Sequence, residues 1–368
     1  MRVVVVGAGV LGASVAYHLA LAGADAVVVD QAHEGRATAA GAGILCPWAP
    51  GLEDPDRYRI SAAGARYYPE LVRKLAEDGE GDIGYKRVGA LMVSGRDAEL
   101  DRIEREVRRR REAAPEAGEI VRLSPAEARA LFPPLHADLA AVRIGGGARV
   151  DGRLLAAALG RAAAKRGARL CAGTAELTAA AGRVRGVRID GEAVEADRVV
   201  VAAGAWAPQL VRPLGVRLAI EPQRGQIVHL GLPGTDTAAW PVILPEGGHY
   251  LLAFDDSRVV VGATRESGSG FDYRVTAAGL AQVLGAALSV APGLGSATLI
   301  ETRVGFRPMA PDARPLLGLL PGIEGLVIGN GLGPSGLTIG PYAGRLLADL
   351  ALGKEPELDL APYAPPGG

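Results

Sequence analysis

The first thirty residues restrict the fold more than any other part of the chain. A β-branched run, "RVVVV", leads directly into Gly7, Gly9 and Gly12, which form the pattern G-x-G-x-x-G. The segment "LGASVAYHLALAG" then indicates a helix, and "AVVVD" indicates a second strand that ends at Asp30. A strand, a helix and a strand within about 30 residues predict the βαβ unit of a dinucleotide-binding fold.

Each of these residues has a predicted role. The first glycine allows a tight turn, the second lets the backbone approach a pyrophosphate, and the third lets helix and strand pack closely. The helix N-terminus offers free amides and the positive end of its dipole to the phosphates. Asp30 follows Gly12 by roughly 18 residues, where a carboxylate can accept hydrogen bonds from ribose hydroxyls. We predict dinucleotide binding; the alternative is a glycine-rich turn that packs a nucleotide-free sheet.

Composition excludes several classes of protein. At 368 residues, 49% hydrophobic and 22% charged, the chain is typical of a soluble globular protein with a large core. A formal net charge of −1 gives no basic footprint for nucleic acid. The cysteines, Cys46 and Cys171, lack metal-ligand spacing and predict no metal site and a reducing compartment. Because no apolar run reaches about 18 residues and no cleavage site follows the first strand, we expect a cytoplasmic protein without a membrane span.

A second glycine-rich stretch selects the dinucleotide. The segment "GNGLGPSGLTIGP" lies near the C-terminus and opens another predicted helix. An ordinary NAD domain would instead continue with further βαβ units and a separate catalytic domain. An FAD molecule stretched across a domain needs its pyrophosphate held at one end and its flavin at the other. The two loops together therefore favour FAD.

Four separated motifs resemble the D-amino-acid oxidase and glycine oxidase family of flavoproteins. They are "GRATAAGAGIL", "VVVAAGAWAPQL", "RVVVGAT" and "GFRPMAPDARPLLG", and they occur in the order found in that family. The resemblance implies an α/β fold with a discontinuous, Rossmann-like FAD-binding domain of the glutathione-reductase type. It also implies a substrate domain of antiparallel β-sheet plus helices. We place the FAD-binding domain at residues 1–80, 145–215 and 302–368, and the substrate-binding domain at 81–144 and 216–301.

The motifs and the resemblance together predict the residues that hold FAD. The backbone near Glu176 would meet the adenine, and the C-terminal loop would hold the pyrimidine side of the flavin. The predicted cofactor-binding set is Gly7, Gly9, Val10, Leu11, Gly12, Asp30, Gln31, Arg36, Thr38, Gly43, Ile44, Leu45, Glu176, Ala203, Gly204, Trp206, Arg307, Gly333, Pro334, Ser335, Gly336, Leu337 and Thr338.

Departures from the family pattern refine this prediction. Ala40 stands where one branch has a histidine that attaches flavin covalently, and no cysteine lies beside Arg307 as in the sarcosine oxidase branch. We therefore expect non-covalent FAD. Val260 stands where sarcosine oxidases have a lysine that activates oxygen. This difference weakens the resemblance to sarcosine oxidases and leaves open whether oxygen or another acceptor takes the electrons.

The resemblance also assigns the catalytic residues, Arg307 and Tyr250. In the family, this arginine forms a two-pronged salt bridge with the substrate carboxylate, and the tyrosine hydroxyl supports the same carboxylate. Guanidinium geometry matches a carboxylate fork, and the pair strengthens away from water. The spacing alone leaves a second interpretation of Arg307 open, a salt bridge to a local acid such as Asp312. For Tyr250 the alternative is a half-buried tyrosine of the sheet.

The predicted reaction is the FAD-dependent oxidative deamination of a small amino acid. The substrate would be a D-amino acid, glycine or a secondary amino acid, and the α-carbon would give a hydride to the flavin to leave an imino acid and then a keto acid. One alternative is a 2-hydroxy-acid dehydrogenase, because Arg307 would bind that carboxylate equally well. Another is an FAD-holding subunit of a multi-subunit amine dehydrogenase. Self-association into a homo-oligomer stays open.

Overall fold

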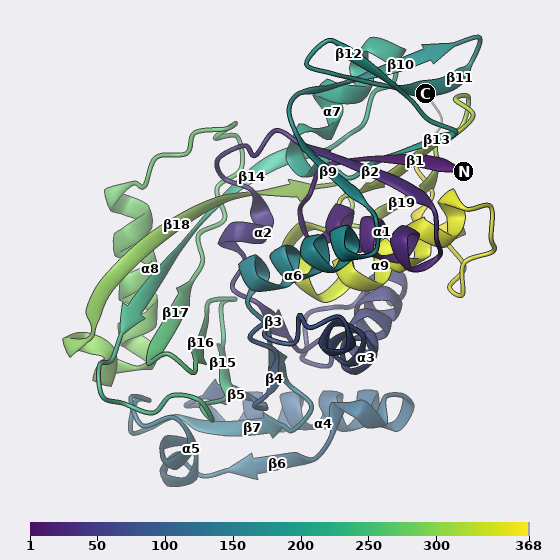
Figure 1. The fold of residues 1–368 in the computed structure, drawn as a ribbon. Helices are drawn as coiled ribbons and strands as arrows, with labels where there is room; N and C mark the ends of the chain where they lie inside the picture. The colour runs from purple at the N-terminus through teal and green to yellow at the C-terminus, as the bar shows by residue number, and fades with distance from the viewer. Residues whose placement is uncertain (367–368) are drawn as a thin grey trace.

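The computed structural model describes residues 1–366, in which two large sheets organise the chain (Figure 1). The first has six strands in the order β19-β20-β13-β1-β2-β9, all parallel except β19. Their bounds are Arg2–Val6 (β1), Asp25–Asp30 (β2), Arg169–Ala172 (β9), Arg198–Val201 (β13), Leu316–Leu319 (β19) and Leu326–Asn330 (β20). The predicted βαβ unit and α/β architecture are confirmed.

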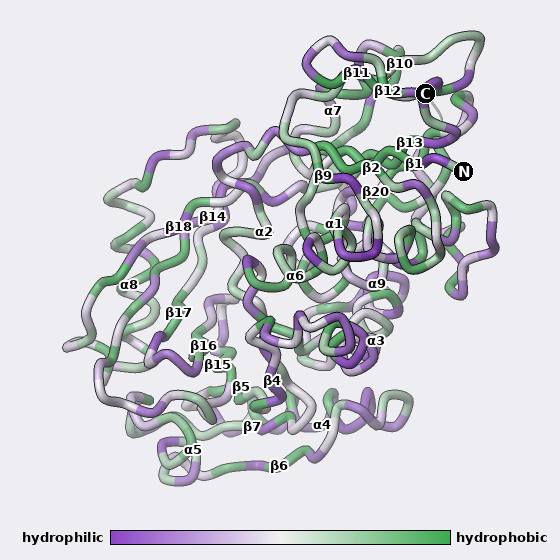
Figure 2. The backbone as a smooth tube through the Cα atoms, viewed as in Figure 1, coloured by the Kyte–Doolittle hydropathy of each residue, from purple (hydrophilic) through white to green (hydrophobic). Residues whose placement is uncertain are grey.

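Strand β1 shows why the valine run forms the centre of this sheet. Val3 and Val5 pack on one side with the cluster that includes α1 (Val10–Leu21), and Val4 and Val6 pack on the other side with β11 (Arg183–Ile189). All four side chains are buried. A strand covered on both faces has no polar side, so a continuous apolar run is the pattern expected of it. Figure 2 shows the hydrophobic colour concentrated along these central strands.

Helices and a small sheet cover the two faces. Helix α1 packs against α6 (Gly152–Lys165) and α9 (Gly336–Ala351), and α9 also packs against α3 (Pro55–Glu77). The opposite face carries an antiparallel sheet and a short helix: β10 (Ala175–Ala180), β11, β12 (Glu192–Glu195) and α7 (Ala207–Val211).

The second large sheet has eight strands in the order β18-β14-β17-β16-β15-β5-β7-β6. Their bounds are Ala90–Ser94 (β5), Ile120–Leu123 (β6), Ala140–Ile144 (β7), Glu221–Gly231 (β14), Val242–Pro245 (β15), Tyr250–Phe254 (β16), Arg258–Gly262 (β17) and Thr298–Met309 (β18). Helix α8 (Ala277–Val290) packs on β14 and β17, and α4 (Asp97–Ala113) and α5 (Pro125–Leu131) pack on the far end. This sheet contains the strands that carry the predicted substrate-binding residues.

The remaining elements are short. They are β3 (Ile44–Leu45), β4 (Lys86–Arg87), β8 (Ala148–Arg149), α2 (Ala37–Ala40) and the 3-10 turns Pro115–Ala117, Gly204–Trp206, Arg212–Leu214, Pro292–Ser296, Gly333–Ser335 and Ala361–Tyr363. Strand β18 starts before residue 302 and stays within the eight-stranded sheet, so the segment containing Arg307 belongs to this sheet. The exact domain boundaries stay a prediction.

Helix α9 begins earlier than its sequence suggests. The pattern after Pro341 indicates a helix from Tyr342, whereas the structure begins the helix at Gly336 and keeps Pro341 inside it. Proline lacks the amide that would donate to the carbonyl four residues earlier, that of Leu337. The hydroxyl of Tyr68, from α3, donates to the Leu337 carbonyl instead. The proline is therefore tolerated because a distant side chain satisfies the oxygen it leaves free.

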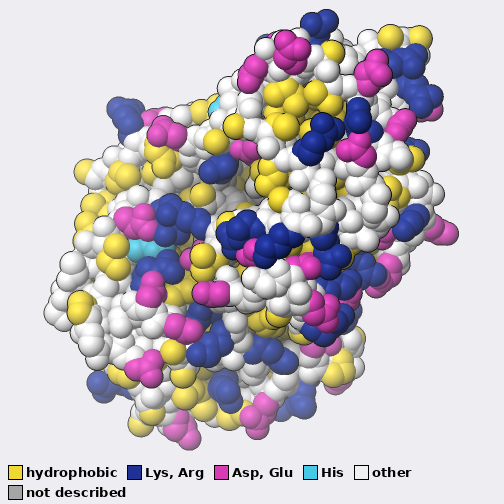
Figure 3. All heavy atoms as spheres, in the orientation of Figure 1, with side chains coloured by type: hydrophobic (Ala, Val, Ile, Leu, Met, Phe, Trp, Pro, Cys, Tyr) yellow, Lys and Arg dark blue, Asp and Glu magenta, His cyan; other side chains and the backbone are white. Residues whose placement is uncertain are grey.

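Among residues 1–366, no helix combines the length and the apolar character that crossing a membrane requires. The face drawn in Figure 3 carries Lys and Arg side chains interspersed with Asp and Glu.

Candidate FAD and substrate site

A cavity of about 410 Å³ lies where the carboxyl ends of β1, β2, β13 and β20 meet the eight-stranded sheet. Its position at the ends of parallel strands is where α/β proteins bind ligands. It brings together most of the residues that the sequence predicts: Gly7, Gly9, Val10, Leu11, Asp30, Gln31, Arg36, Thr38, Gly43, Ile44, Ala203, Gly204, Trp206, Tyr250, Arg307, Gly333, Pro334, Gly336, Leu337 and Thr338.

The glycine loop has the geometry that phosphate binding requires. Gly7 adopts φ 106°, and a Cβ there would lie 2.5 Å from the Ala202 carbonyl oxygen. A Cβ on Gly12 would lie 1.9 Å from the Gly7 oxygen, so only glycine allows the helix to approach the strand this closely. Gly9 lines the cavity, and a Cβ there would lie 3.2 Å from Thr38 Oγ1, closer than an ordinary contact. The residues present therefore fit the pyrophosphate of a dinucleotide.

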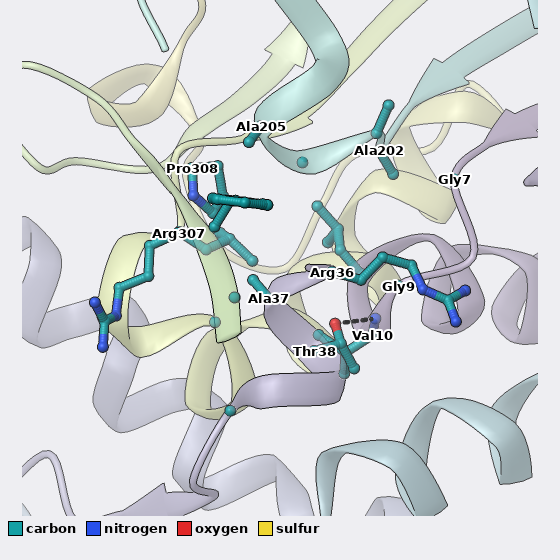
Figure 4. Close-up of a pocket in the computed structure, with 18 of the residues that line it drawn as sticks. Gly7, Gly9, Val10, Arg36, Ala37, Thr38, Ala202, Ala205, Arg307 and Pro308 are labelled. Carbon is teal, nitrogen blue, oxygen red and sulfur yellow. Dashed lines mark hydrogen bonds between the residues drawn. The ribbon is translucent and has the colours of Figure 1, made fainter. Parts of the chain in front are cut away.

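Polar groups around the loop hold its shape. The Val10 amide, at the start of α1, donates to Thr38 Oγ1 over 3.0 Å, as the dashed line in Figure 4 shows. The Asp30 carboxylate accepts from the amides of Ala8 at 2.5 Å and Ala32 at 2.6 Å, and the Arg36 guanidinium lies 3.4 Å from it. Asp30 is thus fixed at the end of β2 facing the cavity, the position predicted for a ribose contact.

The second glycine-rich segment reaches the same cavity from the other side. Gly333 has φ 51° and starts a 3-10 turn that leads directly into α9 at Gly336. The Thr338 hydroxyl donates to the Ile44 carbonyl over 3.2 Å, which ties the start of α9 to β3. The positive end of the α9 dipole therefore faces the cavity and would stabilise negative charge on a reduced flavin.

Four predicted cofactor residues do not line the cavity. Gly12 acts through packing, as described above, and Leu45 is buried in the core around α1. Ser335 lies in the turn before α9 and is not among the residues that line the cavity. The Glu176 side chain is exposed on β10, and its neighbours Gly173, Thr174 and Ala175 line the cavity instead. The part of this segment that faces the cavity therefore lies just before Glu176, and the predicted adenine contact stays a prediction.

The far end of the cavity lies on four adjacent strands of the eight-stranded sheet. Arg307 projects from β18 and Tyr250 from β16, and β14 and β17 lie between these two strands. Glycines occupy the intervening positions: a Cβ on Gly225 would lie 2.5 Å from Arg307 Nη1, and one on Gly262 would lie 2.7 Å from the Tyr250 hydroxyl. The two glycines thus clear the space in which the two polar side chains lie.

The Arg307 guanidinium has no acidic partner among residues 1–366. Its Nη1 donates to the Thr264 carbonyl over 3.1 Å and contacts Gln223 Oε1 at 3.5 Å. Among the described residues no salt bridge joins Arg307 to Asp312, whose carboxylate accepts from the Arg314 amide in its own turn. Burial lowers the pKa of Arg307. Burial also raises the pKa of Tyr250, so its hydroxyl stays protonated and can donate.

Figure 4 shows how the two ends of the site relate. Arg36 and Thr38 lie beside the glycine loop, and the Arg307 side chain extends to the opposite side of the view, away from that loop. The cavity therefore has the glycine loop, the predicted phosphate end, on one side and the Arg307 guanidinium on the other.

Sequence reasoning missed several residues of the cavity. His33 stacks on Trp206 with ring centroids 4.5 Å apart, and Trp206 stacks on Phe271 at 5.0 Å. Arg265, at the end that contains Arg307, also lines the cavity. No local pattern marks His33 or Arg265, since each becomes part of the site only through strands and loops distant in sequence.

A Rossmann-like sheet, two glycine loops on one cavity and a cationic far end define a flavin-dependent oxidoreductase of the two-sheet type. Comparison with known proteins identifies the family: the family model described as FAD dependent oxidoreductase (DAO) matches residues 2–350. The chain belongs to this FAD-dependent oxidoreductase family. The predicted resemblance, the FAD cofactor and the oxidoreductase class are thereby confirmed.

Three similar proteins cover nearly the whole chain. The crystal structure of an iminodiacetate oxidase from Chelativorans sp. BNC1 is 55% identical, with a TM-score of 0.97, covering 100% of this chain and 99% of that one. An uncharacterized oxidoreductase, YurR, of Bacillus subtilis is 49% identical and covers 99% of this chain and 98% of its own. A glycine oxidase of Pseudomonas aeruginosa is 33% identical, covering 100% of this chain and 99% of its own.

The positions that distinguish branches of the family are apolar here. Ala40 lines the cavity, and its Cβ would lie 2.6 Å from a Cβ placed on Gly305. Val260 is buried in an apolar cluster with Ile227 and Leu252. Cys46 is partly buried against the same cluster, and desolvation raises the pKa of its thiol to about 12, which makes it a poor nucleophile. Non-covalent attachment of FAD stays a prediction, and these surroundings favour it.

Proposed function

We propose that this protein oxidises a small amino acid at the carbon next to nitrogen, with glycine and its N-substituted derivatives as the preferred substrates. The observation that carries the proposal is Arg307, a half-buried guanidinium without an acidic partner at the far end of the cofactor cavity. A substrate carboxylate would supply the missing negative charge. Bound FAD would supply the two-electron acceptor, and water would then cleave the resulting imine.

The lining of the cavity bears on how the proton leaves the amine. Apart from arginines, the titratable side chains that line it within residues 1–366 are Asp30, His33 and Tyr250. Asp30 lies at the phosphate end, His33 stacks on Trp206, and the pKa of Tyr250 is raised by burial. None of these is placed to act as a base at the Arg307 end. This favours a mechanism in which the substrate binds with a neutral amine and the protein contributes orientation.

The relatives support the choice of substrate. Two of the similar proteins are named as oxidases of glycine and of iminodiacetate, and both are covered almost completely by this chain. Glycine and iminodiacetate share an N–CH2–carboxylate unit. Arg307 would bind that carboxylate and Tyr250 would donate to it, which directs the CH2 group toward the flavin.

The test is an anaerobic absorbance titration of the FAD-loaded protein with glycine, sarcosine, iminodiacetate, D-alanine and D-proline. We expect flavin bleaching with the N–CH2–carboxylate compounds. Arg307→Ala should retain FAD and lose about 10²-fold or more in kcat/KM, because a carboxylate partner is removed. Arg307→Lys should fall between the two, since an ammonium keeps the charge without the fork. Absence of bleaching by all five compounds would contradict the proposal.

The same samples identify the electron acceptor. Air admitted to the bleached protein should restore the oxidised spectrum within seconds if oxygen is the acceptor, and ammonia or a primary amine should be released. Slow reoxidation in air would instead assign a dehydrogenase that uses another acceptor.

A further inference from the structure

The far end of the cavity contains a second cation. Arg265 lies just after β17, and its side chain lines the cavity together with Arg307. Its Nη2 donates to the Gly248 carbonyl over 2.9 Å, and this hydrogen bond attaches the guanidinium to the loop just before Tyr250. Burial and the charge of Arg265 both lower the pKa of Arg307, which places the two guanidinium groups within electrostatic reach of one another.

Neither cation at this end is neutralised by the protein. Among the cavity-lining residues within 1–366, the charged side chains are Asp30, Arg36, Arg265 and Arg307. Asp30 and Arg36 lie 3.4 Å apart at the phosphate end. Arg265, like Arg307, has no carboxylate within salt-bridge distance in the described part of the chain. The substrate end therefore holds two positive charges without a counter-charge.

The acids nearest to Arg265 in sequence are engaged elsewhere. Glu266 accepts from Arg224 at 2.5 Å, from Gln226 at 2.7 Å and from Thr264 at 2.6 Å. Asp272 lies 2.8 Å from Arg224 and 2.9 Å from Arg274. Arg224 thus holds both carboxylates of this loop on its own side and leaves Arg265 facing the cavity.

We infer that Arg265 is a specificity-determining residue that binds a second carboxylate, so that the preferred substrates are dicarboxylic secondary amino acids. This inference rests on the proposed function. Arg307 holds the carboxylate next to the carbon that is oxidised, and Arg265 holds the carboxylate on the other nitrogen substituent. Arg265 is both exposed to solvent and part of the cavity lining, so the second contact would be at the mouth of the cavity, where an N-substituent would extend.

The experiment compares iminodiacetate with its monoamide, N-(carbamoylmethyl)glycine, which has nearly the same shape but only one carboxylate. The selectivity, defined as the ratio of kcat/KM for the diacid to that for the monoamide, is measured in wild type, Arg265→Gln and Arg274→Gln. Arg274 is on the same loop, carries the same charge and does not line the cavity, so it is the matched control. We expect a ratio of about ten in wild type and Arg274→Gln, reduced to near one in Arg265→Gln.

Two results would overturn the inference. One is a wild-type ratio near one. The other is a ratio that Arg265→Gln leaves unchanged, or that Arg274→Gln lowers equally, which would indicate a general effect of surface charge. Oxidation of sarcosine alongside either result would leave the proposed function standing.

A binding measurement decides the inference even without turnover. If wild type oxidises none of the compounds, the proposed function fails. The change in the absorbance spectrum of bound FAD with iminodiacetate then still gives dissociation constants. Tighter binding of the diacid than of the monoamide, lost in Arg265→Gln, supports the second carboxylate site, and equal binding contradicts it.

Discussion

Substitution of Gly225 by alanine tests whether the position of Arg307 controls the reaction. Gly225 is on β14, paired with Gly305 of β18, and its φ lies outside the left-handed region. The backbone there therefore accepts alanine without strain. The added Cβ, however, would lie 2.5 Å from Nη1, 2.6 Å from Nη2 and 2.7 Å from Cζ of Arg307. Because Cβ contacts need more than about 3.4 Å, the guanidinium has to move by roughly 1 Å.

The displacement predicts a defined loss of activity. A 1 Å misplacement of a binding group can lower the rate about 10²-fold, equivalent to about 2.7 kcal/mol of transition-state stabilisation. We expect Gly225→Ala to retain FAD and its melting temperature, and to lose between about 10-fold and 10²-fold in kcat/KM. The assay is stopped-flow reduction of the flavin without oxygen, over a range of substrate concentrations, which separates binding from the chemical step.

A matched control separates this effect from general damage to the strand. Gly231 is at the other end of β14, and a Cβ there would lie 3.2 Å from the terminal carbon of the exposed Ile300 side chain, which can move aside. Gly231→Ala should therefore keep wild-type kinetics. Wild-type kcat/KM in Gly225→Ala, with folding intact, would refute the assignment of Arg307 as the carboxylate-binding group.

Three further predictions concern stability and cofactor retention. Tyr68→Phe leaves the buried Leu337 carbonyl without its donor and should lower the free energy of unfolding by about 1–3 kcal/mol in urea titrations. Burial lowers the pKa of His18 from 6.5 to about 4. The contribution of the neutral His18 to the free energy of unfolding is therefore complete above pH 6.5 and is lost as the pH falls toward 4. Relative to His18→Gln, the wild type should lose about 3 kcal/mol of stability across that interval, measured by urea titrations at several pH values. Gly12→Ala places a Cβ 1.9 Å from the Gly7 carbonyl oxygen and should yield protein without bound FAD. The measurement is the ratio of flavin absorbance to protein absorbance after purification. The control Gly160→Ala, in α6, should bind FAD normally.

The dinucleotide half of the site could be predicted because its signals are local. Strand β1, the glycines and Asp30 follow one another within one βαβ unit, and hydrophobic periodicity and glycine spacing report on such units directly. The turn at residues 255–257 between β16 and β17 also has a local signal, because two aspartates and a serine stand between two apolar runs. The start of α9 was not, because the hydroxyl that makes Pro341 acceptable comes from Tyr68 in another helix.

The substrate half depends on which strands are neighbours. Gly225 and Gly262 are separated in sequence from the side chains for which they make room, and only the strand order β18-β14-β17-β16 brings them under Arg307 and Tyr250. Arg265 carries no motif at all. The spacing around Arg307 left two interpretations open, and only the family resemblance favoured a substrate carboxylate over Asp312.

The energetics of a buried cation explain why the loop acids are placed as they are. A guanidinium removed from water without a partner is unfavourable, and a carboxylate within reach would neutralise it permanently. The charge of Glu266 acts on Arg307, but no salt bridge joins the two side chains. Arg224, Gln226 and Thr264 hold that carboxylate by hydrogen bonds. Under the proposed function, the free energy that Arg307 would gain from a counter-charge goes to the substrate carboxylate, and binding of that carboxylate would also position the adjacent carbon for oxidation.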